Sequence, residues 1–234
     1  MVPVIINPNF YQIPLPQVNV FIIKVPSGLI LIDTGPAGSK APIFDAIKSI
    51  GLHPADIKHI IVTHSHYDHS GSLADIISEV NATVYMHPVD AKLVKQGIAY
   101  RFKSKTLSKI VDVLTLGSLI KFPRLNIKPV QQITPVKDGD WIPDSTGLRV
   151  IYAPGHSRGQ IALYYPNHKG IVMAADVAEN IERLKLTPAY HDLHKCLSTI
   201  SNLARMDFNI ALFSHGEPIL NDASKIFKEA FGFD

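Results

Sequence analysis

The sequence contains only one cysteine, Cys196, in 234 residues. A single thiol forms no intramolecular disulfide and cannot provide most of the ligands of a metal site. Cys196 lies in the helix-like run HDLHKCLSTISNLARM, where we expect it to be a small buried apolar residue. The cysteine content therefore excludes a disulfide-stapled fold and a metal centre built mainly from thiolates.

Charged residues and long apolar runs are also scarce. Charged residues make up 18% of the chain and hydrophobic residues 46%, which is typical of a globular protein with a substantial core. The net charge of +3 is too small and too evenly spread to indicate a nucleic-acid partner. No run reaches the roughly 18 apolar residues of a membrane span. The start, MVPVIINPNF, lacks the features of a signal peptide, so we expect a cytoplasmic protein.

Apolar runs of strand and helix character alternate in the N-terminal part of the chain. Residues 18–25 and 28–35 are β-branched runs separated by PSG, and they predict a hairpin. Residues 39–51 have helical spacing and end at Gly51, a common helix terminator. The next expected elements are a strand at 58–63, a helix at 72–80 and a strand at 82–87. This alternation predicts an α/β fold.

The alternation is interrupted once, by the long, basic and apolar segment of residues 89–128, which we expect to be helical in two pieces. Strands then resume in the runs QQITPV, DWIP, LRVIYA, QIALYY, GIVMAA and NIALF, with helices near residues 191–206 and in DASKIFKEAF. Both flanks place histidine or aspartate in the loop after a strand, which suggests two similar α/β halves around an insertion. No linker divides them, so we expect one domain over residues 1–234.

The most unusual stretch is THSHYDHSG, directly after the apolar residues 60–62. Imidazole nitrogens and carboxylate oxygens bind borderline divalent ions, and no thiolate is nearby. His64 and His66 are two residues apart, so both side chains point to one side of an extended segment. Asp68 and His69 follow after the chain has turned, which favours two adjacent metal positions. Solvated loop histidines are the alternative, but this spacing rarely arises by chance.

Further candidate ligands stand at the ends of later apolar runs. His156 follows a strand in YAPGHSRG, Asp176 ends the strand IVMAAD, and His215 ends ALFSH. Loops at one edge of a sheet commonly carry functional residues. We therefore expect these three residues to join the cluster.

Together with the preceding LIDTG, these motifs resemble the metallo-β-lactamase superfamily of metal-dependent hydrolases, in the same order from about residue 18 to residue 218. The resemblance implies a four-layer αβ/βα sandwich, with two mixed β-sheets between outer helices. It also implies two metal positions that share a bridging Asp176, the first held by His64, His66 and His156 and the second by Asp68, His69 and His215.

Such a metal pair holds a hydroxide, lowers the pKa of bound water towards about 7 and polarises a carbonyl or phosphoryl oxygen. The resemblance implies that Asp68 and Asp176 are the catalytic carboxylates, and our hypothesis is that Asp68 also helps to orient the hydroxide. Asp33 in LIDTG either supports the ligands from behind or only shapes a turn with Thr34 and Gly35. Two zinc ions are expected, with manganese or iron as alternatives.

Departures from the branches of the superfamily narrow the substrate class. True β-lactamases lack an aspartate at the position of Asp176, which disfavours antibiotic hydrolysis. Thioesterases of the glyoxalase II type share the ligands but carry a longer helical region after the residue that matches His215. Acyl-homoserine lactonases have a tyrosine where this chain has Glu179. The tRNA-processing and nuclease branches carry long basic exosites or an extra domain, and neither is evident.

Residues 89–128 are the best indication of how a substrate is bound. The segment is either a helical cover over the sheet edge or a pocket wall, and it could also form a homodimer contact. The pocket candidates in it are Tyr100, Phe102, Leu116 and Ile120, with Arg101 or Lys103 for an anionic group. Outside it, Glu179, Tyr190 and His191 are weaker candidates, and a helix start with an aromatic core contact is the alternative for the last two.

The sequence thus predicts a binuclear metal-dependent hydrolase of a small ester-like substrate, a thioester or a lactone. A phosphodiesterase of the same fold is the second choice. A mono-iron oxidoreductase that acts on persulfides is a rival, but a complete second ligand set would be superfluous there. Flavin-linked di-iron relatives usually have an acidic residue where His66 stands and an appended flavodoxin domain. The last alternative is a metal-binding scaffold without activity, and no feature of the sequence specifically supports it.

Overall fold

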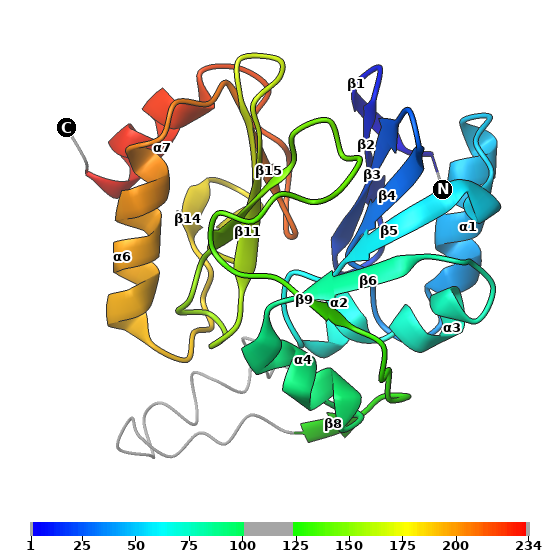
Figure 1. Cartoon of the computed structure of the whole chain (residues 1–234). Coiled ribbons are helices and arrows are strands. Elements are labelled where there is room, and N and C mark those ends of the chain that lie inside the picture. Colours follow the sequence, from blue (N-terminus) through cyan, green and yellow to red (C-terminus); the bar gives the residue numbers. More distant parts are fainter. Residues whose placement is uncertain (1, 101–123, 233–234) are drawn as a thin grey trace.

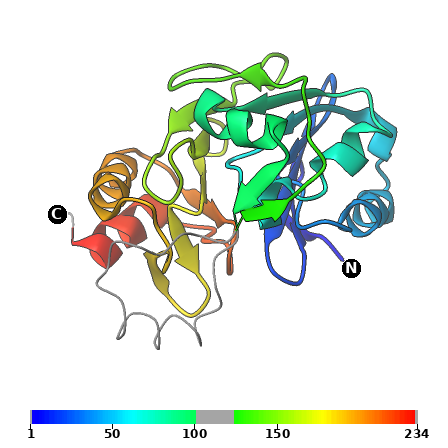
Figure 2. The same cartoon turned by 90° about the horizontal axis from the view of Figure 1, so that it is seen from below.

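The computed structural model describes residues 2–100 and 124–232. Its elements form four layers, in the order helices, sheet, sheet, helices (Figure 1). Helices α6 (Leu193–Ala204) and α7 (Ala223–Phe231) cover one outer face, and α1 (Lys40–Ser49) and α3 (Leu73–Ile77) cover the other. Figure 2 shows the two helical layers again on opposite sides. The predicted αβ/βα sandwich is confirmed.

The first sheet contains seven strands in the order β1-β2-β3-β4-β5-β6-β9. Its first four strands pair antiparallel, and β4, β5, β6 and β9 pair parallel, so the sheet is mixed. The hairpin predicted around PSG is the β3–β4 pair. The strands are β1 (Val4–Asn7), β2 (Phe10–Pro14), β3 (Asn19–Val25), β4 (Gly28–Ile32), β5 (Ile57–Ile61), β6 (Thr83–Met86) and β9 (Thr134–Pro135).

The second sheet has four strands in the order β10-β11-β12-β15, with two antiparallel pairs followed by one parallel pair. The described residues also form the small ribbons β7–β8 and β13–β14. The strands are β10 (Arg149–Tyr152), β11 (Ile161–Tyr165), β12 (Ile171–Ala175), β15 (Ile210–Phe213), β7 (Ile98–Tyr100), β8 (Arg124–Asn126), β13 (Ala178–Asn180) and β14 (Leu184–Leu186). In the part of the chain that the structure describes, the other short helical elements are η1 (Pro54–Asp56), α2 (Tyr67–Ser70) and α4 (Pro88–Lys95).

Alternation of side chains along the strands creates the layers. In β3, Val20 and Ile22 belong to the core under α1 and α3, whereas Phe21 and Ile23 belong to the core between the two sheets. Strand β12 alternates in the same way between the inter-sheet core and the core under α6 and α7. Successive side chains of a strand point to opposite faces, so a strand buried on both faces is apolar throughout. The continuous apolar runs in the sequence are explained by this double burial.

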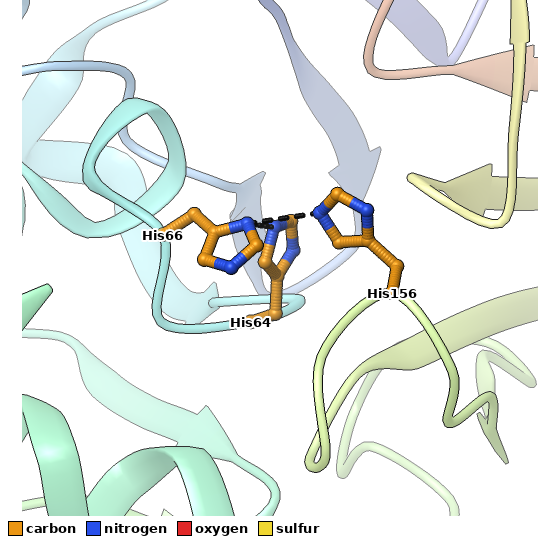
Figure 3. A group of neighbouring side chains, drawn as sticks. All are labelled: His64, His66 and His156. Atoms are coloured by element: carbon orange, nitrogen blue, oxygen red, sulfur yellow. Dashed lines mark hydrogen bonds between the residues drawn. The ribbon is translucent and has the colours of Figure 1, made fainter. Parts of the chain in front are cut away.

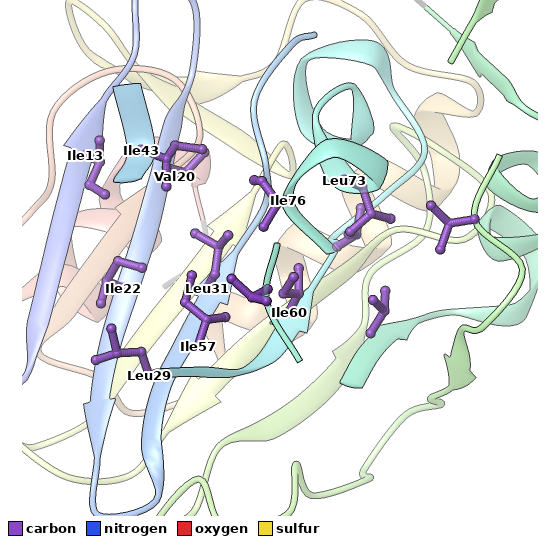
Figure 4. Packing of buried hydrophobic residues seen from close by; sticks show 14 of the residues in the cluster. Ile13, Val20, Ile22, Leu29, Leu31, Ile43, Ile57, Ile60, Leu73 and Ile76 are labelled. Atoms are coloured by element: carbon purple, nitrogen blue, oxygen red, sulfur yellow. The ribbon is translucent and has the colours of Figure 1, made fainter. Parts of the chain in front are cut away.

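The outer core of the first sheet is packed by branched aliphatic residues (Figure 4). Ile43 of α1 and Ile76 of α3 are fully buried there, together with Leu31 and Ile60 of the sheet. Burying one such side chain stabilises a fold by about 1.5–3 kcal/mol relative to leaving it exposed. This packing fixes the end of β4, which Asp33 follows, and the end of β5, which the histidine cluster follows.

Two expectations differ from the structure. The segment 89–128 begins with the helix α4 as expected, but β7 and β8 then pair as an antiparallel ribbon instead of continuing a helix. The DWIP run forms no strand and contributes one isolated bridge, between Trp141 and Arg149. Both runs are short, and pairing with a neighbouring segment decides the state of such runs more than local propensity does. Among the described helices, none is long and apolar enough to cross a membrane.

Candidate metal centre

The histidine cluster begins where β5 ends, and the carboxylate of Asp33 holds its first turn. Asp33 follows β4 with a φ of 60° and is 1% exposed. Its Oδ1 accepts from the backbone N–H of Thr63 at 2.8 Å, and its Oδ2 accepts from the Thr63 hydroxyl at 2.8 Å. Nδ1 of His69 donates to Oδ2 at 2.8 Å. The structure therefore brings Asp33 into contact with a predicted ligand, in addition to its place in a turn.

The first predicted ligand set converges on one point (Figure 3). Nε2 of His64 and Nε2 of His156 each lie 2.9 Å from Nδ1 of His66. Two of these side chains come from the loop after β5 and the third from the loop after β10, so the set joins the two sheets. All three residues are buried, with at most 4% of their surface exposed.

The second predicted set lies beside the first. Oδ2 of Asp68 is 3.8 Å from Nε2 of His69 and 3.7 Å from Nε2 of His215. His69 is fully buried, whereas the side chains of Asp68 and His215 are 26% and 21% exposed. This second set therefore opens towards solvent, and the first does not.

Asp176 lies between the two sets. Its Oδ2 is 3.1 Å from Nε2 of His156 and 3.3 Å from Nε2 of His215, and its Oδ1 is 3.5 Å from Nε2 of His69. Burial raises the pKa of Asp176, but the neighbouring His215, His69 and His156 outweigh burial and hold the pKa well below its usual range. The group between the two sets is thus an ionised carboxylate.

The three histidines of the first set are held in the neutral form. Burial, followed by the neighbouring imidazole of His69, lowers the pKa of His64 well below its usual value. Burial and the imidazole of His156 do the same to the pKa of His66, and burial lowers the pKa of His156 despite the charge of Asp176. A neutral imidazole carries the lone pair that a metal ligand needs.

His69 has the opposite environment. Burial lowers its pKa, but the carboxylates of Asp33, Asp176 and Asp68 outweigh burial and raise the pKa to about 10. Three carboxylates around one buried ring favour a positive charge at this place. A divalent cation satisfies the same requirement.

The polar atoms of the cluster fit a metal in two further respects. Nε2 of His69 and Oδ1 of Asp176 are buried and have no hydrogen-bond partner among the described residues. The Nδ1 atoms of His156 and His215 donate to the carbonyls of Ala189 at 2.7 Å and Gln17 at 2.9 Å, which leaves each Nε2 as a lone-pair donor. Five imidazoles and two carboxylates suit a borderline divalent ion.

The pocket candidates occupy different places. Tyr100 ends β7, and its backbone forms a bridge with His66, so it lies beside the cluster. Glu179 is 4% exposed and forms an ion pair with Lys185 at 3.2 Å. Tyr190 is 39% exposed. The candidates Arg101, Phe102, Lys103, Leu116 and Ile120 lie outside the described residues.

His191 is an exposed neighbour of the His156 loop. Its backbone N–H donates to the carbonyls of Gly155 at 2.8 Å and His156 at 3.1 Å. Its Nε2 accepts from Nε of Arg158 at 2.7 Å. The residue therefore contacts the cluster through its backbone, and its ring pairs with a cation of the same loop.

Two threonines support the cluster but were not among the site residues predicted from the sequence. Thr63 joins Asp33 to the loop, and its hydroxyl also lies 3.1 Å from Nδ1 of His64. The Thr187 hydroxyl donates to the backbone carbonyl of Asp176 at 2.8 Å. Thr63 stands directly before the first histidine and could have been suspected, whereas nothing in the sequence around Thr187 indicates this contact.

The family model of the metallo-beta-lactamase superfamily matches residues 13–215 of the chain. The chain belongs to the metallo-beta-lactamase superfamily. It is therefore a metal-dependent hydrolase with a small-molecule substrate, and the fold implies that it binds divalent metal, as the histidine–aspartate cluster allows.

The chain is similar to several members of the superfamily that are described by name. It is 27% identical over 218 residues to the probable metallo-hydrolase YflN of Bacillus subtilis strain 168, covering 86% of this chain and 81% of that protein. It is 28% identical over 200 residues to the N-acyl homoserine lactonase AttM of Rhizobium radiobacter, covering 74% and 68%. The thioesterase pkgB of Emericella nidulans is 29% identical over 108 residues, covering 45% and 31%.

Solved structures of the superfamily share the fold. The metallo-beta-lactamase SMB-1 bound to 2-mercaptoethanesulfonate superimposes with a TM-score of 0.70 at 20% identity, over 92% of this chain and 80% of that one. The beta-lactamase from Chitinophaga pinensis gives a TM-score of 0.72 at 21% identity, over 98% and 89%. At this level of identity the likeness concerns the fold alone.

Proposed function

We propose that this superfamily member is a binuclear hydrolase that cleaves a small ester-like substrate, a thioester or a lactone. The observation that carries the proposal is the position of Asp176, whose two carboxylate oxygens face histidines of both ligand sets. We assign His64, His66 and His156 to a first ion and Asp68, His69 and His215 to a second, with Asp176 between them.

The chain's own residues have three tasks in this reaction. The two ions, when bound, supply Lewis-acid chemistry, lowering the pKa of bound water to about 7 and polarising the substrate carbonyl. Asp68 is partly exposed at the edge of the second set, where it accepts a hydrogen bond from the attacking water and orients it. Asp33 accepts a hydrogen bond from Nδ1 of His69, so that Nε2 of this ring would be the atom that holds the second ion. Buried His64 and His66 keep one side of the site closed to solvent.

Two relatives support an ester-like substrate, since one is named a lactonase and another a thioesterase. Glu179 is the main departure from the lactonases, and its ion pair with Lys185 supports a structural role. The position of Asp176 between both sets argues against antibiotic hydrolysis, because true β-lactamases lack it. Zinc is the metal that we propose, and manganese or iron would suit the same donors.

Elemental analysis of the purified protein is the deciding experiment, followed by a screen of thioesters, lactones and phosphodiesters. We expect about two zinc or manganese ions per chain, and turnover of a thioester or lactone. His66→Ala should lose one ion and the activity, whereas His194→Ala, an exposed histidine of α6, should retain both. About one iron per chain, or full metal content and activity in His66→Ala, would contradict the proposal. Turnover of phosphodiesters alone would keep the metal centre and replace the substrate class.

A further inference from the structure

Asp90 is a buried carboxylate that is outside both ligand sets. It lies in the first turn of α4, with 1% of its surface exposed. Burying an ionised carboxylate is costly unless several hydrogen bonds compensate for the lost hydration. The donors that compensate Asp90 therefore indicate what the residue does.

Among the described residues, the three hydrogen bonds that Asp90 accepts all come from the loops that carry the first ligand set. Oδ2 of Asp90 accepts from the backbone N–H of Ser65 at 2.8 Å, from the Ser65 hydroxyl at 3.0 Å and from the Ser157 hydroxyl at 2.9 Å. Ser65 stands between His64 and His66, and Ser157 directly follows His156. One oxygen thus joins two loops that come from opposite sheets.

The other oxygen of Asp90, Oδ1, packs against the backbone of the loop that carries His156. A Cβ on Gly159 would lie 2.5 Å from Oδ1 of Asp90 and 2.7 Å from the Asp90 nitrogen. Such distances are too short for any side chain, so a glycine is required for the loop to approach α4. The approach explains one residue of the SRG sequence that follows His156.

Helix α4 presents the carboxylate from a fixed position. His87 caps the helix by accepting from the backbone N–H of Val89, Pro88 starts it, and Val94 is buried in the core of the first sheet. Figure 1 shows α4 near the ends of both sheets. Hydrogen bonds to an ionised acceptor are roughly twice as strong as bonds between neutral groups. The helix is therefore able to impose a spacing on the two loops.

We propose that Asp90 is a positioning residue that holds the loops of His64, His66 and His156 at the spacing that binds the first metal ion. It touches neither the ion nor the substrate and acts through Ser65 and Ser157. The inference rests on the proposed metal centre, to which it adds a residue that couples the two halves of the molecule.

The test compares metal-free Asp90→Ala, Asp90→Asn and Ser157→Ala with the wild type. Zinc is titrated against a competing chelator, and cobalt is added to record its absorption spectrum. We expect Asp90→Ala to weaken one of the two binding steps by about 10- to 100-fold and to leave the other unchanged. Asp90→Asn should recover part of the loss, because its amide oxygen can still accept from Ser65. Asp75→Asn, which removes a partly exposed acid of α3 that pairs with Lys128, is the matched control.

Ser157→Ala is the second route, because it breaks only the link between the loops and keeps the buried carboxylate paired with Ser65. It should weaken the same binding step, including in the case that Asp90→Ala does not fold. Two steps weakened equally, or two steps unchanged in folded variants, would overturn the positioning role.

Amide hydrogen exchange in the metal-free protein separates this inference from the proposed metal centre. If Asp90 holds the loops, exchange at Ser65 and in residues 157–160 should accelerate at least about tenfold in Asp90→Ala. In Ser157→Ala only residues 157–160 should accelerate, and neither region should change in Asp75→Asn. Unchanged exchange would overturn the clamp itself. A wild type that takes up no metal but shows the accelerated exchange would instead contradict the proposed centre and leave the clamp in place.

Discussion

The orientation of each imidazole depends on what its other nitrogen contacts. Carbonyls hold His156 and His215, and a carboxylate holds His69. These acceptors determine which nitrogen faces the site, and such outer partners commonly matter nearly as much as the ligands themselves. The residue-scale predictions therefore concern side chains around the cluster.

Asp33→Asn should weaken metal binding about 10- to 100-fold at the position that contains His69. The carboxylate holds the His69 ring and both polar groups of Thr63, and an amide cannot accept all of these bonds. Chelator competition on the purified variant measures the change, with Asp75→Asn as the control. Unchanged affinity would leave Asp33 with the turn role only, which its φ of 60° already indicates.

Cys196 should be unreactive towards an aromatic disulfide reagent in the native protein and react fully after unfolding in urea. Burial, helped by the charge of Asp192, raises the pKa of the Cys196 thiol to about 12, and only the thiolate is a nucleophile. The released chromophore is counted with and without denaturant. A full equivalent released within seconds from the native protein would show that the thiol is accessible. The sequence predicted that Cys196 is a small buried residue, and its 2% exposure confirms this prediction.

At the scale of the element, α6 connects the outer helical layer to the His156 loop. The backbone N–H of Asp192 donates to Gly155, and a Cβ on Gly155 would lie 2.4 Å from the nitrogen of Cys196. Gly155 has a φ of 140°, so both its conformation and its surroundings require glycine. The loop that carries His156 is therefore held by the start of α6 as well as by α4.

Asp192→Ala should lower the free energy of unfolding by about 0.5–2 kcal/mol. The Asp192 side chain caps α6 by accepting from the backbone N–H of Lys195 at 3.1 Å. Urea unfolding of the metal-free protein measures the loss. Asp192→Asn is the matched variant, since asparagine caps helices equally well, and it should retain most of the stability. An equal loss in both variants would show that the charge matters and the cap does not.

At the scale of the whole molecule, the cluster is one of the places where the two halves meet. Direct backbone bonds also join them, from Ile161 to Thr63 at 2.9 Å and from Asn19 to Ser214 at 2.7 Å. The first ligand set takes side chains from both halves, so a bound ion stabilises only the folded arrangement. Metal binding should therefore contribute to global stability.

Removing metal with a chelator should lower the melting temperature, and adding zinc should restore it. One site at a free metal concentration 100 times its dissociation constant adds about 2.7 kcal/mol. For a chain of this size, each kcal/mol shifts the melting temperature by roughly 2–4 °C, so each site should contribute about 5–10 °C. Differential scanning calorimetry of the loaded and stripped protein measures the shift. Equal melting temperatures would show that the ions do not join the halves.

Local patterns in the sequence predicted most of the layers and the cluster. Strands buried on both faces produce continuous apolar runs, and the HSHYDH motif concentrates polar ligands within a few residues. The prediction of helix was wrong for the ribbon of β7 and β8. Each strand is too short to show the alternation of polar and apolar residues that identifies a strand, and the two strands are far apart in the chain. Expectations for residues 101–123 lie outside the described residues.

What the sequence determined by itself is the chemistry: which residue types stand together, in which order, and on which kind of fold. Only the tertiary structure decided which other side chains hold the predicted ligands in place. Asp90 lies 25 residues from Ser65 and 67 residues from Ser157. Nothing in the sequence of α4, PVDAKLVK, distinguishes Asp90 from the other acidic residues of the chain. Such a contact exists only after two sheets and a helix have packed, because packing, and not local sequence, sets the distance between distant loops.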